Sequence, residues 1–293
     1  MPRLRGYSEP FLVTNGKKFN LDDIDPSAMP SQFESEAAAQ EALASGLAAL
    51  SDLQDKLYAQ NEWGLLVVLQ GMDAAGKDMA VKHVFSGLNP QGCDVHPFKA
   101  PSTEELDHDF LWRSSQRLPE RGRIGVFNRS YYEEVLVARV HRDILKHQQL
   151  PQQLIGKKIW KERYEDINAF ERYLTRNGIL VLKFFLYVSN GEQRRRLLSR
   201  LDEPEKNWKF SLNDPKERVY WDDYMKAYEK AIRATATPFA PWYVVPADNK
   251  WWAHLIITDA IVASLESLKL AYPVPDARHR AELRAVRKTL DKS

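Results

Sequence analysis

The stretch GMDAAGKD, residues 71–78, holds two glycines, a lysine and two aspartates at a spacing that could bind phosphate. It follows an apolar run and precedes a helical pattern, which is the setting of the phosphate loop G-x-x-x-x-G-K-[ST]. Gly71 and Gly76 would let the backbone turn tightly with its N–H groups inward, and a helix starting near Lys77 would add its positive end. The sequence therefore predicts a phosphate site, with a plain strand-to-helix turn as the alternative.

The residue after Lys77 departs from that pattern, because Asp78 replaces the Ser or Thr whose hydroxyl normally reaches Mg²⁺. A second carboxylate, Asp73, lies inside the loop and would repel a phosphate unless a divalent cation separated the two. Mg²⁺ usually takes one or two carboxylates plus substrate phosphates, so Asp73 is predicted to be a direct or water-mediated ligand. Asp78 has two interpretations: a metal-linked carboxylate, or an acidic residue that favours the first turn of a helix.

A second group of polar residues follows the apolar run RIGVF, in the segment VFNRSYYEEVLVARVH. Asn128 stands at the strand end, where an amide could contact a metal or position water but supplies no charge. Arg129 could bind phosphate through two parallel hydrogen bonds. Glu133 lies about one helical turn further on. It would restore the missing carboxylate or orient an acceptor nucleotide, and the alternative is a solvated residue of a helix's first turn.

Composition excludes several classes of protein. The chain has 293 residues, a formal net charge of +2, 44% hydrophobic and 28% charged residues. No window approaches the roughly 18 apolar residues that span a bilayer, and the N-terminus lacks the apolar core of a signal peptide. The single cysteine, Cys93, cannot form an internal disulfide, and together these features favour the cytoplasm. Near-neutral charge leaves anion binding to local clusters, notably EQRRRLLSR at 192–200 and ARHRAELRAVRK at 277–288.

The elements that must position these residues alternate between strands and helices. Alternation of this kind predicts an α/β fold in which a parallel sheet of five strands lies between two helical layers, with ligands outside the carboxyl ends of the strands. The five predicted strands are GLLVVLQG at 64–71, Asp94–Phe98, Arg123–Phe127, Gly178–Val188 and Trp242–Pro246.

The chain is predicted to be a single domain, residues 1–293, with three additions. A long N-terminal helix is expected within about 30–62, from Glu34 to Gln60, because apolar residues recur there at helical spacing. A basic C-terminal helix within about 276–293 follows YPVPD and is expected to pack loosely. Between the last two strands, residues 201–218 are polar enough for a mobile lid, and a helix follows around Tyr220–Thr235.

Several long motifs in order give the chain a resemblance to a known family. GMDAAGKD, FKAPSTEELDHDFLWR, PERGRIGVFNRSYYEEVLVARVH, LDEPEKNWKFS and WDDYMKAYEKAI with APWYVVPADNKWW together resemble the polyphosphate kinase 2 family, from about Asp22 to Leu268. The resemblance implies a P-loop kinase fold with a helical lid. It also implies transfer of phosphoryl groups from inorganic polyphosphate to nucleotides, here to both AMP and ADP, so that AMP becomes ADP and then ATP.

The resemblance also implies which residues act. Gly71, Asp73, Gly76 and Lys77 would form the phosphate and metal loop, with Ala74, Ala75 and Asp78 completing it; Asn128, Arg129 and Glu133 would form a second wall; and Arg113 and Lys209 would contact further phosphates. Many members of the family carry Asp where this chain has Asn128, which shifts metal binding toward Asp73 and Glu133. Clustered basic residues predicted to grip polyphosphate include Lys82, Lys99 and the run Arg194, Arg195, Arg196 and Arg200, about half of which would face solvent.

The predicted mechanism is direct in-line attack of a nucleotide phosphate oxygen on the terminal phosphorus of polyphosphate, with Mg²⁺, or Mn²⁺ in its place, near Asp73 and Asn128. Lys77 and Arg129 would balance the charge, and no side-chain nucleophile is needed. The expected partners are polyphosphate, AMP, ADP and ATP, without nucleic acid or membrane, and the resemblance suggests a homo-oligomer such as a tetramer. Three alternatives are a polyphosphate kinase restricted to diphosphates, an ATP-dependent monophosphate kinase, and a protein that binds polyphosphate without catalysis.

Overall fold

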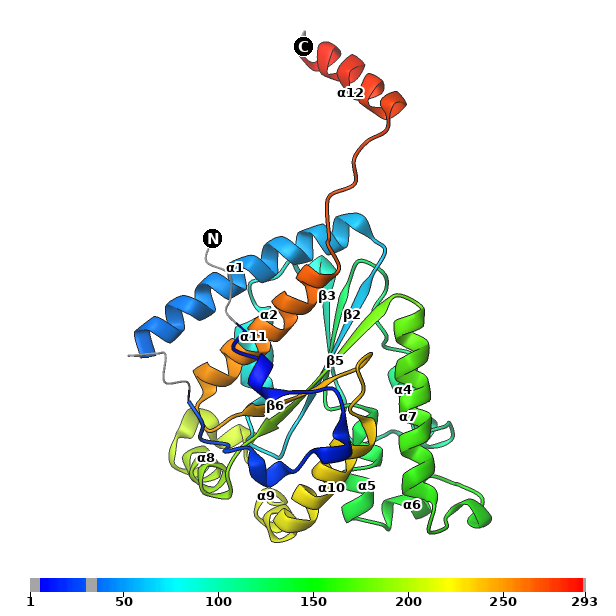
Figure 1. Cartoon of the computed structure of the whole chain (residues 1–293). Coiled ribbons are helices and arrows are strands. Elements are labelled where there is room, and N and C mark those ends of the chain that lie inside the picture. The colour runs from blue at the N-terminus through cyan, green and yellow to red at the C-terminus, as the bar shows by residue number, and fades with distance from the viewer. Residues whose placement is uncertain (1–5, 30–35, 292–293) are drawn as a thin grey trace.

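Six strands form one sheet in the computed structural model, which describes residues 6–29 and 36–291 (Figure 1). The order across the sheet is β1-β6-β5-β2-β4-β3. Strands β2 to β6 run parallel to one another, whereas β1 pairs with β6 in the antiparallel direction. The strands are β1 Leu12–Val13, β2 Gly64–Gln70, β3 Cys93–Pro97, β4 Ile124–Asn128, β5 Ile179–Tyr187 and β6 Trp242–Pro246.

The five strands expected from the sequence correspond to β2 through β6, within about one residue at each end. All seven residues of β2 are buried, because the strand lies between β4 and β5 with helices over both faces of the sheet. The predicted count of five is nevertheless wrong, since β1 adds a sixth strand at the edge. A two-residue strand in a polar leader carries no periodic signal that a sequence pattern could reveal.

Helices cover the two faces of the sheet (Figure 1). On one face α11 packs on β5 and β6 and also contacts α1 and α2; on the other, α7 packs on β5 and α10 packs on α7. The α-helices are α1 Glu36–Gln60, α2 Lys77–Phe85, α3 Thr103–Leu106, α4 Trp112–Ser115, α5 Val137–Val140, α6 Ile144–His147, α7 Ile159–Arg176, α8 Asn190–Asp202, α9 Asp214–Glu217, α10 Trp221–Thr235, α11 Lys250–Ser267 and α12 Ala277–Leu290.

Short 3₁₀ helices, labelled η, occupy many of the connections. They are η1 Glu9–Phe11, η2 Gly16–Lys18, η3 Leu21–Asp23, η4 Pro90–Gly92, η5 Tyr131–Glu134, η6 Gln152–Leu154, η7 Pro204–Lys209 and η8 Arg218–Tyr220. The segment predicted as a lid, residues 201–218, contains the end of α8, then η7 and α9, and reaches the first residue of η8.

The two predicted terminal helices differ in their packing. Helix α1 buries one face against α11, and the first residues of the range predicted for it, 30–35, lie outside the described residues. Helix α12 buries none of its residues and stands clear of the rest of the molecule at the end of an exposed connection (Figure 1). In the described part of the chain, none of the helices has both the length and the hydropathy needed to cross a bilayer.

Candidate active site

The predicted phosphate loop connects the end of β2 with the start of α2, and its glycines are required by its geometry. A Cβ on Gly71 would lie 2.9 Å from the carbonyl oxygen of Leu186 on β5. Gly76 has a φ of +112°, a left-handed conformation that side chains strongly disfavour. Ala74 also has a positive φ, of +62°. The loop is thus a tight turn at the carboxyl edge of the sheet, as the sequence predicted, and the positive φ of Ala74 adds backbone strain.

Lys77 begins α2 and folds back over the loop. Its Nζ donates hydrogen bonds to the carbonyl oxygens of Gly71, at 2.6 Å, and Met72, at 3.0 Å. The side chain is buried, with 8% of its surface exposed. The ammonium group is therefore held inside the curve of the loop, where an incoming phosphate could replace the backbone carbonyls as its partner.

The surroundings of Lys77 lower the pKa of its ammonium group to about 8. Burial is the largest cause, and the neighbouring guanidinium of Arg129 also lowers the pKa. The carboxylates of Asp73, Glu133 and Asp78 act in the opposite direction. The loop lysine thus shares one small region with three carboxylates and an arginine, and a bound polyanion would restore its preference for the charged form.

A second wall stands beside the loop because β4 is the neighbour of β2. Asn128 at the end of β4 pairs in register with Leu69, and the N–H of Arg129 donates to the carbonyl oxygen of Leu69 at 3.0 Å. Arg129 has a φ of +66°, which turns the chain sharply as it leaves the strand. Strand order thus brings this turn against a loop more than fifty residues earlier in the chain.

Arg129 joins the two walls. Its Nη2 donates to Oδ1 of Asp73 at 2.6 Å, and its Nη1 donates to Oε2 of Glu133 at 3.2 Å. Burial alone would lower the pKa of Arg129, but Glu133 and Asp73 outweigh it and the pKa is raised. The structure thus brings Asp73, Lys77, Arg129 and Glu133, four of the five predicted catalytic residues, into one cluster.

The fifth, Asn128, contacts the same loop at a different residue. Its Nδ2 donates to Oδ1 of Asp78 at 2.7 Å. Asp78 is exposed in the first turn of α2, so both interpretations of this residue keep a structural basis: it stands at a helix N-terminus, and it faces the second wall.

The carboxylates of the loop suit a Mg²⁺ ion that also binds substrate phosphates. Among residues 6–29 and 36–291, no three His, Cys, Asp or Glu side chains lie close enough to form a metal site from protein alone. Mg²⁺ does not require such a cage, because it commonly keeps waters and takes one or two carboxylates together with phosphates. Asp73 and Asp78 are oxygen donors beside the phosphate loop and fit that role.

Arg196 of α8 supports the loop from behind. Its Nη1 donates to the carbonyl oxygens of Ala74 and Ala75, at 3.1 and 2.9 Å. Its Nη2 donates to those of Ala247 and Asp248, at 2.6 and 3.0 Å, in the connection after β6. Arg196 belongs to the basic run predicted to grip polyphosphate, but here it is buried, and its donors are used by backbone carbonyls and by the carboxylate of Glu192. It is a positioning residue, and the sequence alone could not separate it from its neighbours.

Gln193, one helical turn before Arg196, also reaches the loop and was not identified from the sequence. Its Nε2 donates to the carbonyl oxygen of Asp73 at 2.9 Å, and its Oε1 accepts a hydrogen bond from Arg218. Arg218 also donates to Oδ1 of Asn190 at 2.7 Å. A buried glutamine thus links the phosphate loop to the far end of the predicted lid segment.

Two residues predicted to bind phosphate, Arg200 and Lys209, belong to the lid segment and its base. Nη1 of Arg200 donates to Oδ2 of Asp214 on α9 at 3.0 Å. Burial and then the nearby carboxylate of Asp73 raise the pKa of Asp214, while Arg200 opposes them. Nζ of Lys209 lies 5.0 Å from the ring centroid of Trp208, which is 78% exposed. The segment therefore places an acidic residue near Asp73 and a lysine at the surface.

The structure places Arg113 and Lys82 outside the cluster. Nη1 of Arg113 donates to the carbonyl oxygen of Lys99 at 2.8 Å, and the guanidinium lies 3.9 Å from Glu105 and from Glu134. Arg113 also lines a separate cavity of about 80 Å³. Lys82 is exposed on α2.

A buried polar network fixes the segment that carries Glu133. Lys183 on β5 and Glu171 on α7 form an ion pair of 2.5 Å with no exposed side-chain surface. The hydroxyls of Tyr131 and Tyr132 each donate to Oε1 of Glu171 at 2.9 Å, and Lys183 donates to the carbonyl oxygen of Thr235 at 2.8 Å. Burial raises the pKa of Glu171 and lowers that of Lys183. The network anchors η5, so that the side chain of Glu133 extends from a segment that is fixed in place.

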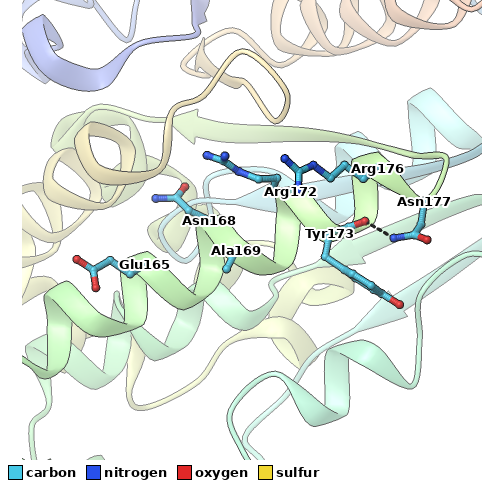
Figure 2. Close-up of a pocket in the computed structure, with 7 residues that line it drawn as sticks. All are labelled: Glu165, Asn168, Ala169, Arg172, Tyr173, Arg176 and Asn177. Atoms are coloured by element: carbon cyan, nitrogen blue, oxygen red, sulfur yellow. Dashed lines mark hydrogen bonds between the residues drawn. The ribbon is translucent and has the colours of Figure 1, made fainter.

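A separate hollow of about 480 Å³ lies along α7, lined by Glu165, Asn168, Ala169, Arg172, Tyr173, Arg176 and Asn177 (Figure 2). All of these residues come from one helix and its C-cap, and Tyr173 is 63% exposed. The hollow ends next to Gly178, whose carbonyl accepts from the N–H of Gly64 at the start of β2. It is therefore at the opposite end of the sheet from the phosphate loop.

Known proteins resemble this chain over most of its length. Residues 33–272 match the family model described as polyphosphate kinase 2. An ADP-polyphosphate phosphotransferase of Rhodopseudomonas palustris is 51% identical over 96% of this chain and 97% of its own length. An AMP/ADP-polyphosphate phosphotransferase of Meiothermus ruber is 44% identical over 88% of this chain and 93% of its own. The crystal structure of polyphosphate kinase 2 from Arthrobacter aurescens, 39% identical, covers 97% of this chain and 99% of its own with a TM-score of 0.86.

Proposed function

This chain belongs to the polyphosphate kinase 2 family, and from that membership we propose that it transfers phosphoryl groups from inorganic polyphosphate to ADP and to AMP. The observation that carries the proposal is the cluster in which Asp73 and Lys77 of the loop meet Arg129 and Glu133 from the end of β4. Two cations and two carboxylates at the carboxyl edge of a parallel sheet suit the transfer of a phosphoryl group between two polyanions.

Positioning and charge neutralisation are what the protein supplies in such a reaction, because phosphoryl transfer needs little covalent help from side chains. A nucleotide phosphate oxygen attacks the terminal phosphorus of polyphosphate, and the bond from that phosphorus to its bridging oxygen breaks. The shortened polyphosphate leaves with the electron pair of that bond. Lys77 neutralises the transferring group from the loop side, and Arg129 neutralises it from the side of β4.

Arg129 changes partners in this proposal. In the structure it is bound by Asp73 and Glu133, which keep a part-buried guanidinium paired. Phosphate oxygens would take over as acceptors, since an arginine can bind them through two parallel hydrogen bonds. Asp73 would then be released for a cation. When bound, Mg²⁺ would be held by Asp73, with Asp78 or Asn128 beside it, and would screen the carboxylates from the phosphates.

Residues 201–218 are proposed to act as a lid. The segment continues directly from α8 at its start, and Arg200 and Arg218 fasten its C-terminal part to α8, which in turn holds the loop through Gln193 and Arg196. A segment tied at both ends, with an exposed Trp208 between them, could close over bound substrate as a unit and exclude water.

The two named relatives differ in the acceptor that their names give, ADP alone for one and AMP or ADP for the other. We propose that this chain accepts both, and the test is a time course. Purified protein is incubated with Mg²⁺, long-chain polyphosphate and AMP, and nucleotides are separated by chromatography. ADP should appear first and ATP later. No product from AMP, with ATP formed from ADP, would restrict the enzyme to diphosphates.

A further inference from the structure

Helix α12 carries most of its positive charge along one stripe. Arg280, Arg284, Arg287 and Lys288 recur at intervals of four, three and one residues, which places them on neighbouring positions of a single helical face. At about 1.5 Å per residue, the stripe extends for roughly 12 Å along the axis. Leu283 and Val286 lie to one side of it, so the cationic stripe and an apolar stripe are distinct.

The charges of the stripe are largely uncompensated. In the described part of the chain, Arg280, Arg284 and Lys288 take part in no ion pair, and Arg287 has only Asp291 at 3.8 Å. Glu282, the acidic residue within the helix, is occupied by Arg278 at 3.1 Å and His279 at 3.5 Å on a different face. An exposed row of four cations without anionic partners is matched in charge to an extended polyanion.

The position of α12 separates it from the catalytic cluster. Residues 268–276 connect it to α11, and Figure 1 shows it on the opposite side of the molecule from α8 and α9. The helix therefore cannot touch the phosphates that react within the same copy of the chain. Only a long polymer could contact both places, with its end at the loop and a remote stretch on α12.

We propose that Arg280, Arg284, Arg287 and Lys288 of α12 form a second binding site for inorganic polyphosphate, which holds a remote part of a long chain while its end reacts. The proposal rests on polyphosphate being the donor. Polyphosphate is chosen as the ligand because it carries negative charge at every repeat and has no bases to recognise, and the stripe offers charge without an aromatic side chain on which a base could stack. Tethering a donor in this way raises its effective concentration at the loop without changing the chemical step.

The test compares the unchanged protein with a variant that lacks the charges of the stripe, using polyphosphate donors of different length. The variant Arg280→Gln/Arg284→Gln/Arg287→Gln/Lys288→Gln keeps helix-forming residues and leaves Leu283 and Val286 in place. Its KM for long-chain polyphosphate should rise by about three- to tenfold. The slope of log KM against log salt concentration should become smaller by up to about 3, because four phosphate contacts are lost. The KM for ADP, the kcat and the KM for the shortest oligophosphate that the unchanged protein accepts should stay the same.

A matched pair of single variants distinguishes the effect of the stripe from the effect of the total charge of α12. Arg284→Gln and Arg278→Gln each remove one positive charge from α12, but only Arg284 belongs to the stripe. Arg284→Gln should raise the KM for the long donor more than Arg278→Gln does. Equal KM values for long-chain polyphosphate in the quadruple variant and the unchanged protein would overturn the proposal. If the quadruple variant instead lost binding to vesicles of anionic lipid with that KM unchanged, α12 would be a membrane-binding helix.

Different results would contradict the proposed function and the second binding site. A protein that forms no ATP from ADP and polyphosphate of any length would contradict the proposed function itself. The protein could instead be active, with a quadruple variant whose KM values for long and short polyphosphate equal those of the unchanged protein. That result would contradict only the second site.

Discussion

Nη2 of Arg129 lies 2.6 Å from Oδ1 of Asp73, although 56 residues separate the two along the chain. The contact joins the phosphate loop after β2 to the turn after β4, and the same guanidinium also reaches Glu133. It keeps an anionic loop residue neutralised before substrate arrives. The exchange of these carboxylates for phosphate oxygens is the event on which the proposed chemistry depends.

Replacing Arg129 should impair catalysis more than folding. Arg129→Lys keeps one charge but cannot direct two nitrogens at two acceptors, and we expect kcat to fall by about 100-fold, as removal of a charge-stabilising donor commonly does. The kcat of Arg129→Met should fall further. Steady-state rates with ADP and long-chain polyphosphate provide the measurement, and thermal unfolding is the control. Near-normal kcat in Arg129→Lys would mean that a point charge suffices there.

The reaction should lose rate in alkaline solution. Burial lowers the pKa of Lys77 to about 8 in the free protein, so the lysine is charged below that pH and neutral above it. Because kcat/KM reports groups of the free enzyme, kcat/KM for polyphosphate should fall as pH rises through about 8. The fall in kcat should come at higher pH, since bound phosphates favour the charged lysine. A kcat/KM that stays level up to pH 10 would show that Lys77 does not lose its proton there.

Two adjacent arginines on α8 offer a matched comparison. Arg195 and Arg196 both pair with Glu192, but Arg195 is 68% exposed, whereas Arg196 donates to the carbonyl oxygens of Ala74 and Ala75. Arg196→Gln should lower kcat by about tenfold or more, because small displacements of a positioning residue weaken the reacting geometry. It should also lower the melting temperature, since buried carbonyls lose their donor. Arg195→Gln should change neither by much, and equal effects of the two variants would contradict the positioning role of Arg196.

Glu133 is predicted to select the acceptor. Its carboxylate binds Arg129 and extends from the anchored η5 segment beside the loop, where it could orient the incoming nucleotide phosphate. Glu133→Ala should therefore weaken the use of AMP more than the use of ADP, measured as kcat/KM for each acceptor at saturating polyphosphate. An equal loss with the two acceptors would assign Glu133 to the general support of Arg129 instead.

Much of the architecture could be predicted because its signals are local. The apolar runs of β2, β4, β5 and β6 end next to polar residues, and glycine spacing marks the loop. The sequence pattern did not reveal β1, a two-residue strand that pairs with the edge of β6. A strand of that kind exists because of tertiary contact and not because of its own residues.

The partners within the site could not be predicted in the same way. Arg129 was expected to meet phosphate, but its pairing with Asp73 depends on β4 lying next to β2, which the chain order does not specify. Arg196 could not be distinguished from Arg194 and Arg195, because the helix phase and the packing of α8 decide which arginine turns inward. Gln193 gave no signal, since a buried amide looks like any surface glutamine until its partners are known.

The most direct measurement is the formation of ATP from ADP with long-chain polyphosphate as the sole other phosphoryl donor. The purified protein with Mg²⁺ should make ATP in proportion to the polyphosphate consumed, and omission of polyphosphate should abolish it. Lys77→Ala should still unfold in a cooperative thermal transition, which shows that it folds, and should make none. ATP formed equally without polyphosphate, with matching AMP, would mean that ADP is the donor. That result, or full activity in Lys77→Ala, would contradict polyphosphate-driven transfer at this loop.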